Sequence, residues 1–118
     1  MTIQEAVAKV RDYSDEQNGK YVTSETATRI TRGFHGGDPE RIRDLLSRVA
    51  QSGVDVVDDD YEYVYRRENG MEDFGDEDEK LRESITSRLK NEWRKKIETN
   101  GSGLLGKVGL SSPVLRAK

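Results

Sequence analysis

The residues in this sequence that are best suited to chemistry are three arginines of the segment 39–51. Arg41, Arg43 and Arg48 all fall on the polar side of that segment, and a guanidinium group can bind either a phosphate or the edge of a guanine base. The same arginines could instead pair with neighbouring carboxylates, as solvated charges do on an ordinary helix surface. The pattern therefore predicts either an anion-binding surface or a plain solvated face.

Other residue types that could support catalysis lack partners in the sequence. His35 is the only histidine, and a lone histidine in a turn is usually a turn residue. Residues 73–75 spell the magnesium motif of kinases, but the chain has no glycine-rich or catalytic loop. The consecutive aspartates 58–60 would point in different directions, which does not suit a metal ion. We therefore expect a protein that is not an enzyme, with no catalytic residue, no metal ligand and no cofactor.

Composition limits the chain to a small fold. Of its 118 residues 32% are hydrophobic and 36% charged, which fits one domain and an appendage. The absence of cysteine excludes disulfides, thiolate zinc sites and cysteine nucleophiles. No apolar run is long enough for a membrane span, and the first residues lack the features of a signal peptide. We expect an intracellular, cytoplasmic protein of cellular or viral origin, with no membrane partner.

Charge is distributed unevenly along the chain. The net charge is −3 in residues 1–67, −7 in residues 68–79 and +7 in residues 80–118. A near-neutral front is thus followed by an acidic connector and a basic rear. The basic segment 80–118 could bind phosphate, an acidic protein surface or the acidic connector of its own chain.

The periodicity of apolar residues predicts the elements that must position the arginines. Helical spacing indicates helices at 2–13, at about 24–33 and at 39–51, and the third carries Asp38 as its cap and a proline at its first position. Residues 20–22 suit a short strand. Two further runs, 54–57 and 61–67, are β-rich and flank a polar turn, which predicts a β-hairpin.

This order of elements resembles the winged helix-turn-helix superfamily. The stretch RIRDLLSRVAQSGVDVVDDDYEYVYRR, residues 41–67, is similar to the third helix and wing of that superfamily, and the resemblance covers about residues 2–67. It implies an α+β, mainly helical fold with a winged helix-turn-helix domain at 1–67. One departure is the turn at 33–37, which is longer than the usual tight turn.

The resemblance also implies how the domain would work. The helix at about 39–51 would enter the major groove of double-stranded DNA, as in a small transcriptional regulator. Arginines of the preceding helix would neutralise phosphates or remain ordinary surface charges, and the two that end the wing would offset its aspartates. The candidate DNA-binding residues are Arg29, Arg32, Arg41, Arg43, Ser47, Arg48, Arg66 and Arg67.

The rear of the chain is predicted to contain three segments. Residues 68–78 form an acidic linker, residues 79–99 an amphipathic C-terminal helix, and residues 100–118 a flexible tail, because four glycines interrupt the tail's apolar residues. The helix places an apolar stripe at spacing four, which suits packing on its own domain or on a partner. The resemblance implies a homodimer through this interface, which comprises Leu81, Ile85, Leu89, Trp93 and Ile97.

A second hypothesis comes from a different functional class. The chain could be a protein-interaction or structural subunit of a viral or other large assembly, with the winged helix as a scaffold. The tail at 101–118 would then be a docking strap that becomes ordered on a partner protein. The negative total charge, the acidic wing and the apolar tail favour this hypothesis, and the arginines of the third helix favour the first.

Overall fold

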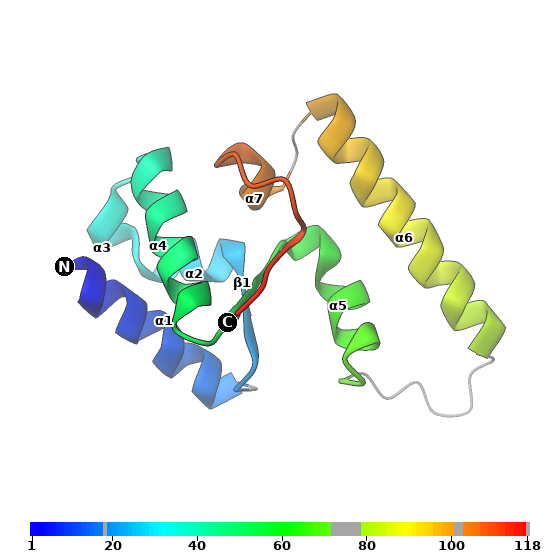
Figure 1. Cartoon of the computed structure of the whole chain (residues 1–118), viewed down its shortest axis with the longest axis horizontal. Coiled ribbons are helices and arrows are strands. Elements are labelled where there is room, and N and C mark those ends of the chain that lie inside the picture. Colours follow the sequence, from blue (N-terminus) through cyan, green and yellow to red (C-terminus); the bar gives the residue numbers. More distant parts are fainter. Residues whose placement is uncertain (18, 72–78, 101–102, 118) are drawn as a thin grey trace.

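Helices surround a small sheet in the computed structural model, which describes residues 1–17, 19–71, 79–100 and 103–117 (Figure 1). The helices are α1 (Ile3–Gln17), α2 (Ser24–Ile30), α3 (Arg32–His35), α4 (Pro39–Gln51), α5 (Glu62–Glu68), α6 (Glu79–Asn100) and α7 (Leu104–Lys107). The strands are β1 (Tyr21–Thr23), β2 (Asp55–Val57) and β3 (Val114–Leu115), and a 3-10 helix η1 spans Asp59–Tyr61. The fold is therefore α+β and mainly helical, as predicted.

The caps of the long helices agree with the sequence. The N–H of Glu5 donates to Thr2 Oγ1 over 3.2 Å at the start of α1, and α1 extends to Gln17, four residues beyond the predicted end. The N–H of Glu40 donates to Asp38 Oδ1 over 3.0 Å at the start of α4. Each bond satisfies a backbone donor that the first turn of a helix leaves unpaired.

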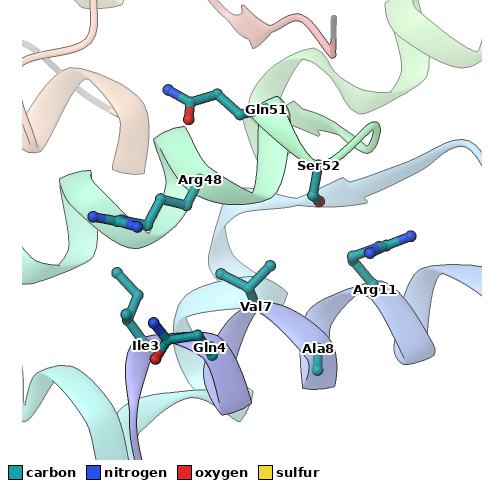
Figure 2. A pocket seen from close by; sticks show the side chains of 8 residues that line it. All are labelled: Ile3, Gln4, Val7, Ala8, Arg11, Arg48, Gln51 and Ser52. Atoms are coloured by element: carbon teal, nitrogen blue, oxygen red, sulfur yellow. The ribbon is translucent and has the colours of Figure 1, made fainter.

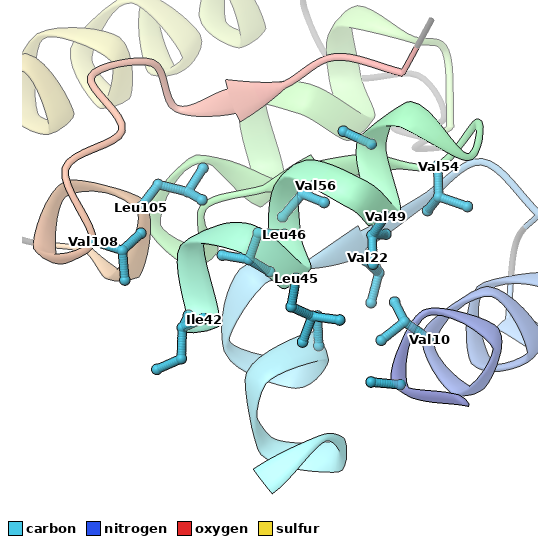
Figure 3. Packing of buried hydrophobic residues seen from close by; sticks show 13 residues of the cluster. Val10, Val22, Ile42, Leu45, Leu46, Val49, Val54, Val56, Leu105 and Val108 are labelled. Atoms are coloured by element: carbon cyan, nitrogen blue, oxygen red, sulfur yellow. The ribbon is translucent and has the colours of Figure 1, made fainter. Parts of the chain in front are cut away.

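Helix α4 lies at the centre of the hydrophobic core, as Figure 3 shows. Its apolar stripe faces α1, α2, α3 and the sheet, which fixes both its position and its rotation about its own axis. Val10 of α1, Val22 of β1 and Leu105 of α7 close the core around it. The buried residues of the stripe are Ile42, Leu45, Leu46, Val49 and Ala50.

The sheet joins three segments that are far apart in the sequence. Its order is β1-β2-β3, with β1 parallel and β3 antiparallel to β2. Tyr21 pairs with Asp55, and Val57 pairs with Val114. The central strand thus has partners on both sides, one from each end of the chain.

The predicted β-hairpin at 54–57 and 61–67 is wrong in its second half. Residues 55–57 form β2, but the chain then passes through η1 into α5, so the described residues form no wing. The buried residues of α5 are the adjacent Val64 and Tyr65, which a strand would send to opposite faces. A short apolar run is ambiguous between strand and helix, and here both edges of β2 are occupied by other strands.

The predicted flexible tail at 100–118 is also wrong for the residues that the structure describes, 103–117. Leu105 is 0% exposed and Val114 5%, and β3 completes the sheet. A tail of few apolar groups cannot order itself alone, but the core and β2 provide a surface that receives it. The segment belongs to the fold, so it is not a free docking strap for a partner protein.

Asp58 holds the beginning of this C-terminal segment. Its carboxylate accepts the N–H of Asp60 over 3.0 Å and the N–H of Leu105 over 3.3 Å, so one side chain caps both η1 and α7. Its own N–H donates to the carbonyl of Pro113 over 2.8 Å. Gly103, with φ of +91°, approaches so closely that a Cβ there would overlap the carboxylate. Glycines that suggest disorder in the sequence permit close packing in the structure.

Helix α6 lies along one side of the molecule, beside α5 and η1 (Figure 1). Trp93 is 8% exposed and meets the Tyr61 ring edge to face at 6.1 Å. Residues 72–78 of the predicted linker lie outside the described residues, and Glu68 belongs to α5 rather than to a linker. Among the described helices, none combines the length and apolar character that a membrane crossing requires.

Candidate nucleic-acid interface

Arg41 lies at the first turn of α4 and is tied to α3. Its Nη1 donates to the carbonyl of Phe34 over 3.2 Å, and its guanidinium lies 6.0 Å from the centre of the Phe34 ring. Its Nε lies 3.8 Å from Asp38 Oδ2, and 62% of the side chain remains exposed. The aromatic contact and the carbonyl therefore orient the guanidinium without removing it from solvent.

Arg43 and Arg48 are exposed on opposite flanks of the same helix. Arg48 Nε lies 3.2 Å from Asp44 Oδ1, and both side chains are 53% exposed. Such exposed pairs contribute little to stability, so a phosphate could replace the carboxylate. Arg43 lies beside the segment that follows α7, where a Cβ on Gly109 would be 3.8 Å from its Nη1. Ser47, the fourth predicted residue of α4, is half-buried.

The middle of the exposed face of α4 is less basic than its sequence suggests. At 100° per residue, the positions opposite the buried stripe are Glu40, Asp44, Ser47 and Gln51. The arginines flank this line on either side. The face therefore places carboxylates at its centre and guanidinium groups at its margins.

Arg29 of α2 and Arg32 of α3 are both exposed. Within the described parts of the chain, neither makes an ion pair, and the same holds for Arg43. These three cations lie on three consecutive helices, α2, α3 and α4. They are consequently open to an external anion.

Arg66 belongs to an internal network and not to a wing. Its Nη1 donates to the Tyr21 hydroxyl over 2.7 Å, and that hydroxyl donates to Glu62 Oε2 over 2.8 Å. Burial raises the pKa of Tyr21, an effect that the bond from Arg66 opposes and the bond to Glu62 reinforces. Arg67 on the same helix is half-buried. The prediction that Arg66 and Arg67 end a β-hairpin is wrong, because they belong to α5, which directs Arg66 toward β1.

His35, the last residue of α3, has a structural role before α4. Its ring is 6% exposed, its Nε2 lies 2.8 Å from the carbonyl of Thr28, and its Nδ1 accepts the N–H of Gly37 over 2.8 Å. These contacts assign the proton to Nε2. Both nitrogens thus join the end of α3 to α2 and to the following turn, and His35 is the last residue of α3 rather than a residue of the predicted turn.

An acidic hollow that no sequence pattern indicated lies where β2 ends. It measures about 380 Å³ and is lined by side chains of α2, η1 and α7. Burial, together with a hydrogen bond shared with the Glu25 carboxyl, raises the pKa of Asp59 to about 7, and a hydrogen bond with Thr23 opposes this shift. Burial also raises the pKa of Asp58. Among the described residues, no cluster of three or more acidic, histidine or cysteine side chains is arranged to hold a metal ion.

The predicted interface of α6 is divided between buried and exposed positions. Trp93 is buried against its own domain, with Lys90 paired to Glu68 and Lys96 Nζ lying 3.7 Å from Asp60. Its indole N–H completes no hydrogen bond but lies near enough to lower the pKa of Asp58. Leu81 remains 55% exposed, and the half-buried residues of the stripe are Ile85, Leu89 and Ile97.

An apolar groove separates α1 from α4 on the far side of the helix from Arg43. It measures about 400 Å³ and is lined by Ile3, Gln4, Val7, Ala8, Arg11, Arg48, Gln51 and Ser52. Figure 2 shows Val7 in its middle, Arg48 reaching over Ile3, and Arg11 at the other end. The groove therefore adjoins one flank of the arginine-bearing face.

Comparison with known proteins gives no relative from which a function can be carried over. No protein-family model matches this sequence, and neither a curated protein nor a solved structure matches it.

Proposed function

We propose that this chain is a non-enzymatic protein that binds double-stranded DNA with α4, in the manner of a small cytoplasmic transcriptional regulator. The observation that carries the proposal is the exposure of Arg41, Arg43 and Arg48 on a helix whose opposite side lies at the centre of the main hydrophobic cluster. A helix fixed in this way presents side chains in defined positions, which a sequence-reading surface requires. The helix-turn-helix resemblance of the sequence supports the same assignment.

The arrangement of charges suggests which side chains would contact phosphates and which would contact bases. Arg29, Arg32 and the flanking arginines of α4 suit phosphates, which supply affinity without sequence information. Glu40 and Asp44, on the central line of the face, suit the N4 amino group of cytosine. Without a wing to add phosphate contacts, affinity should be modest and should fall steeply with salt.

The test is a salt-titrated anisotropy measurement with labelled duplex DNA. Arg41→Ala/Arg43→Ala should weaken binding by roughly 1–3 kcal/mol for each base that an arginine recognises. For each phosphate that an arginine neutralises, the double variant should instead lower the slope of log binding constant against log salt concentration by about 1. The matched control is Lys9→Ala/Arg88→Ala, which removes two exposed charges from α1 and α6 and should have a smaller effect.

Two results would overturn the proposal. The first is wild-type binding that does not depend on salt, and the second is an equally large weakening in the control double variant. Sedimentation of the same complexes gives their stoichiometry and tests a homodimer through α6. The exposed Leu81 supports that dimer, although Trp93 is already covered within one chain.

A protein-interaction or structural subunit is the second candidate, and specific observations favour it. The described residues form no wing, and Arg66 is bonded internally to Tyr21. Carboxylates occupy the centre of the α4 face. In this alternative the helical unit acts as a scaffold, and the C-terminal segment contributes to its core rather than to a partner.

A further inference from the structure

The groove between α1 and α4 combines an apolar floor with two cationic ends (Figure 2). Ile3, Val7 and Ala8 line it from α1. Val7 packs against the core from its half-buried position, whereas Ala8 is exposed. The floor is thus a rigid surface that belongs to the core, and part of it remains open to solvent.

The two ends of the groove attract negative charge. Arg11 makes no ion pair among the described residues, and Arg48 has only the exposed partner Asp44. A guanidinium group forms its strongest hydrogen bonds with a carboxylate or a phosphate. The site therefore favours an anionic group at each end of an apolar segment.

The apolar floor and the arginine at each end restrict the class of ligand that can bind in the groove. A nucleic-acid backbone could use the arginines but would cover Val7 and Ala8 with charged sugar-phosphate, which gains little from an apolar floor. Ala8 of the floor is exposed to solvent, so a compact ligand would leave part of its own surface in water. A peptide segment can place an apolar side chain on the floor and carboxylates at both ends.

We propose that this groove docks a short acidic amphipathic segment of a partner protein. One leucine-like or aromatic side chain of the segment packs on Val7 and Ala8, and carboxylates on either side pair with Arg11 and Arg48. This surface is separate from the proposed phosphate contacts of Arg29 and Arg43, so it extends the function beyond DNA binding. Since Arg48 borders both surfaces, a docked segment would compete with DNA at that flank.

The test uses three synthetic peptides of one length and matched helicity. The first carries a single leucine flanked by glutamates, the second the same leucine flanked by lysines, and the third serine in place of leucine between glutamates. The first should bind, with NMR shifts at Val7 and Ala8. The other two should bind at least about tenfold more weakly, because each lacks either the charged hydrogen bonds or the buried apolar side chain.

Variants of α1 complete the test. Arg11→Glu should weaken binding of the first peptide by roughly tenfold or more. Ala8→Tyr should prevent its binding, because the larger side chain fills the groove. Lys9→Glu makes the same kind of charge reversal on the same helix but outside the groove, and it should leave binding within about twofold. Equal binding of all three peptides, or binding that survives both Arg11→Glu and Ala8→Tyr, would refute the proposal. Arg11 is not among the proposed DNA contacts, so a failure here is distinct from a failure of DNA binding.

Discussion

The three consecutive aspartates at positions 58–60 make different contacts in the folded protein. Asp58 is 0% exposed and caps two helices, Asp59 pairs with Glu25, and Asp60 faces Lys96. Their side chains point in different directions, as neighbouring residues of any extended or turning backbone must. The burial of Asp58 could not be predicted from the sequence, because it depends on a C-terminal segment that begins more than forty residues later.

The first prediction concerns the dependence of stability on pH at Asp59. Its pKa rises from 3.8 to about 7 in the folded protein, so folding favours the protonated form. The protonated Asp59 carboxyl therefore makes its full contribution to the free energy of unfolding below about pH 4. This contribution is lost as the pH rises through about 7. We expect the urea midpoint of the wild type to fall across this window relative to that of Asp59→Asn, which cannot ionise.

The control for this measurement is Asp12→Asn, at an exposed position of α1. Its urea midpoint should follow the wild type at every pH, because Asp12 does not line the acidic hollow. Parallel curves for the wild type and Asp59→Asn would show that folding does not raise the pKa of Asp59. The proton shared with Glu25 would then be absent.

Helices of three or more turns could be predicted from the sequence, and so could the short elements α2, β1 and β2, whereas α3, η1, α5, α7 and β3 could not. The stripes of α1, α4 and α6 recur over enough residues to identify a helix and its buried side. The segment Tyr61–Arg67 is too short for that, and its tyrosines alternate as they would in a strand. Its real environment is set by β2, whose two edges are filled by strands from other parts of the chain.

Some features of the candidate site could likewise be predicted from the sequence, and others could not. The exposure of Arg41, Arg43 and Arg48 follows from the phase of α4 and is confirmed. The internal bonding of Arg66 does not follow from any local pattern, since its partner Tyr21 lies forty-five residues earlier. Local periodicity thus identifies which side of a helix is exposed, and only tertiary contacts identify which charges are already used.

A prediction for α6 tests whether this helix is stabilised within one chain. Trp93→Ala should lower the free energy of unfolding by about 3–5 kcal/mol, because it removes a buried ring from between α6 and η1. Leu81→Ala on the same helix is the control and should change it by less than about 0.5 kcal/mol, since Leu81 is exposed. Equal effects in a urea titration of the two variants would contradict the packing of α6 on its own domain.

The molecule as a whole is closed by contacts between its first, middle and last segments. Asp55 of β2 accepts the Tyr65 hydroxyl over 2.7 Å and the N–H of Ala117 over 2.6 Å, while burial and the neighbouring Asp55 raise the pKa of Tyr65. Arg116 lies above the Tyr65 ring at 5.6 Å. The bond between Ala117 and Asp55 spans 62 residues. A contact over such a separation closes a large loop, which is entropically costly and cannot be predicted from local sequence patterns.

The last prediction concerns the contribution of the C-terminal segment to the stability of the whole fold. Leu105 is 0% exposed within the main core, so Leu105→Ala should leave a cavity and lower the free energy of unfolding by about 2–5 kcal/mol. The neighbouring Leu104 is half-buried, so Leu104→Ala is a matched control with a smaller expected effect. Hydrogen exchange should show the same coupling, with slow exchange at Leu110, whose N–H donates to the carbonyl of Leu105 over 2.7 Å. If that amide exchanges as fast as in an unfolded chain while β1 and β2 stay protected, the segment is not part of the cooperative core. The core would then consist of the front of the chain alone, and β2 would have an open edge where β3 should pair.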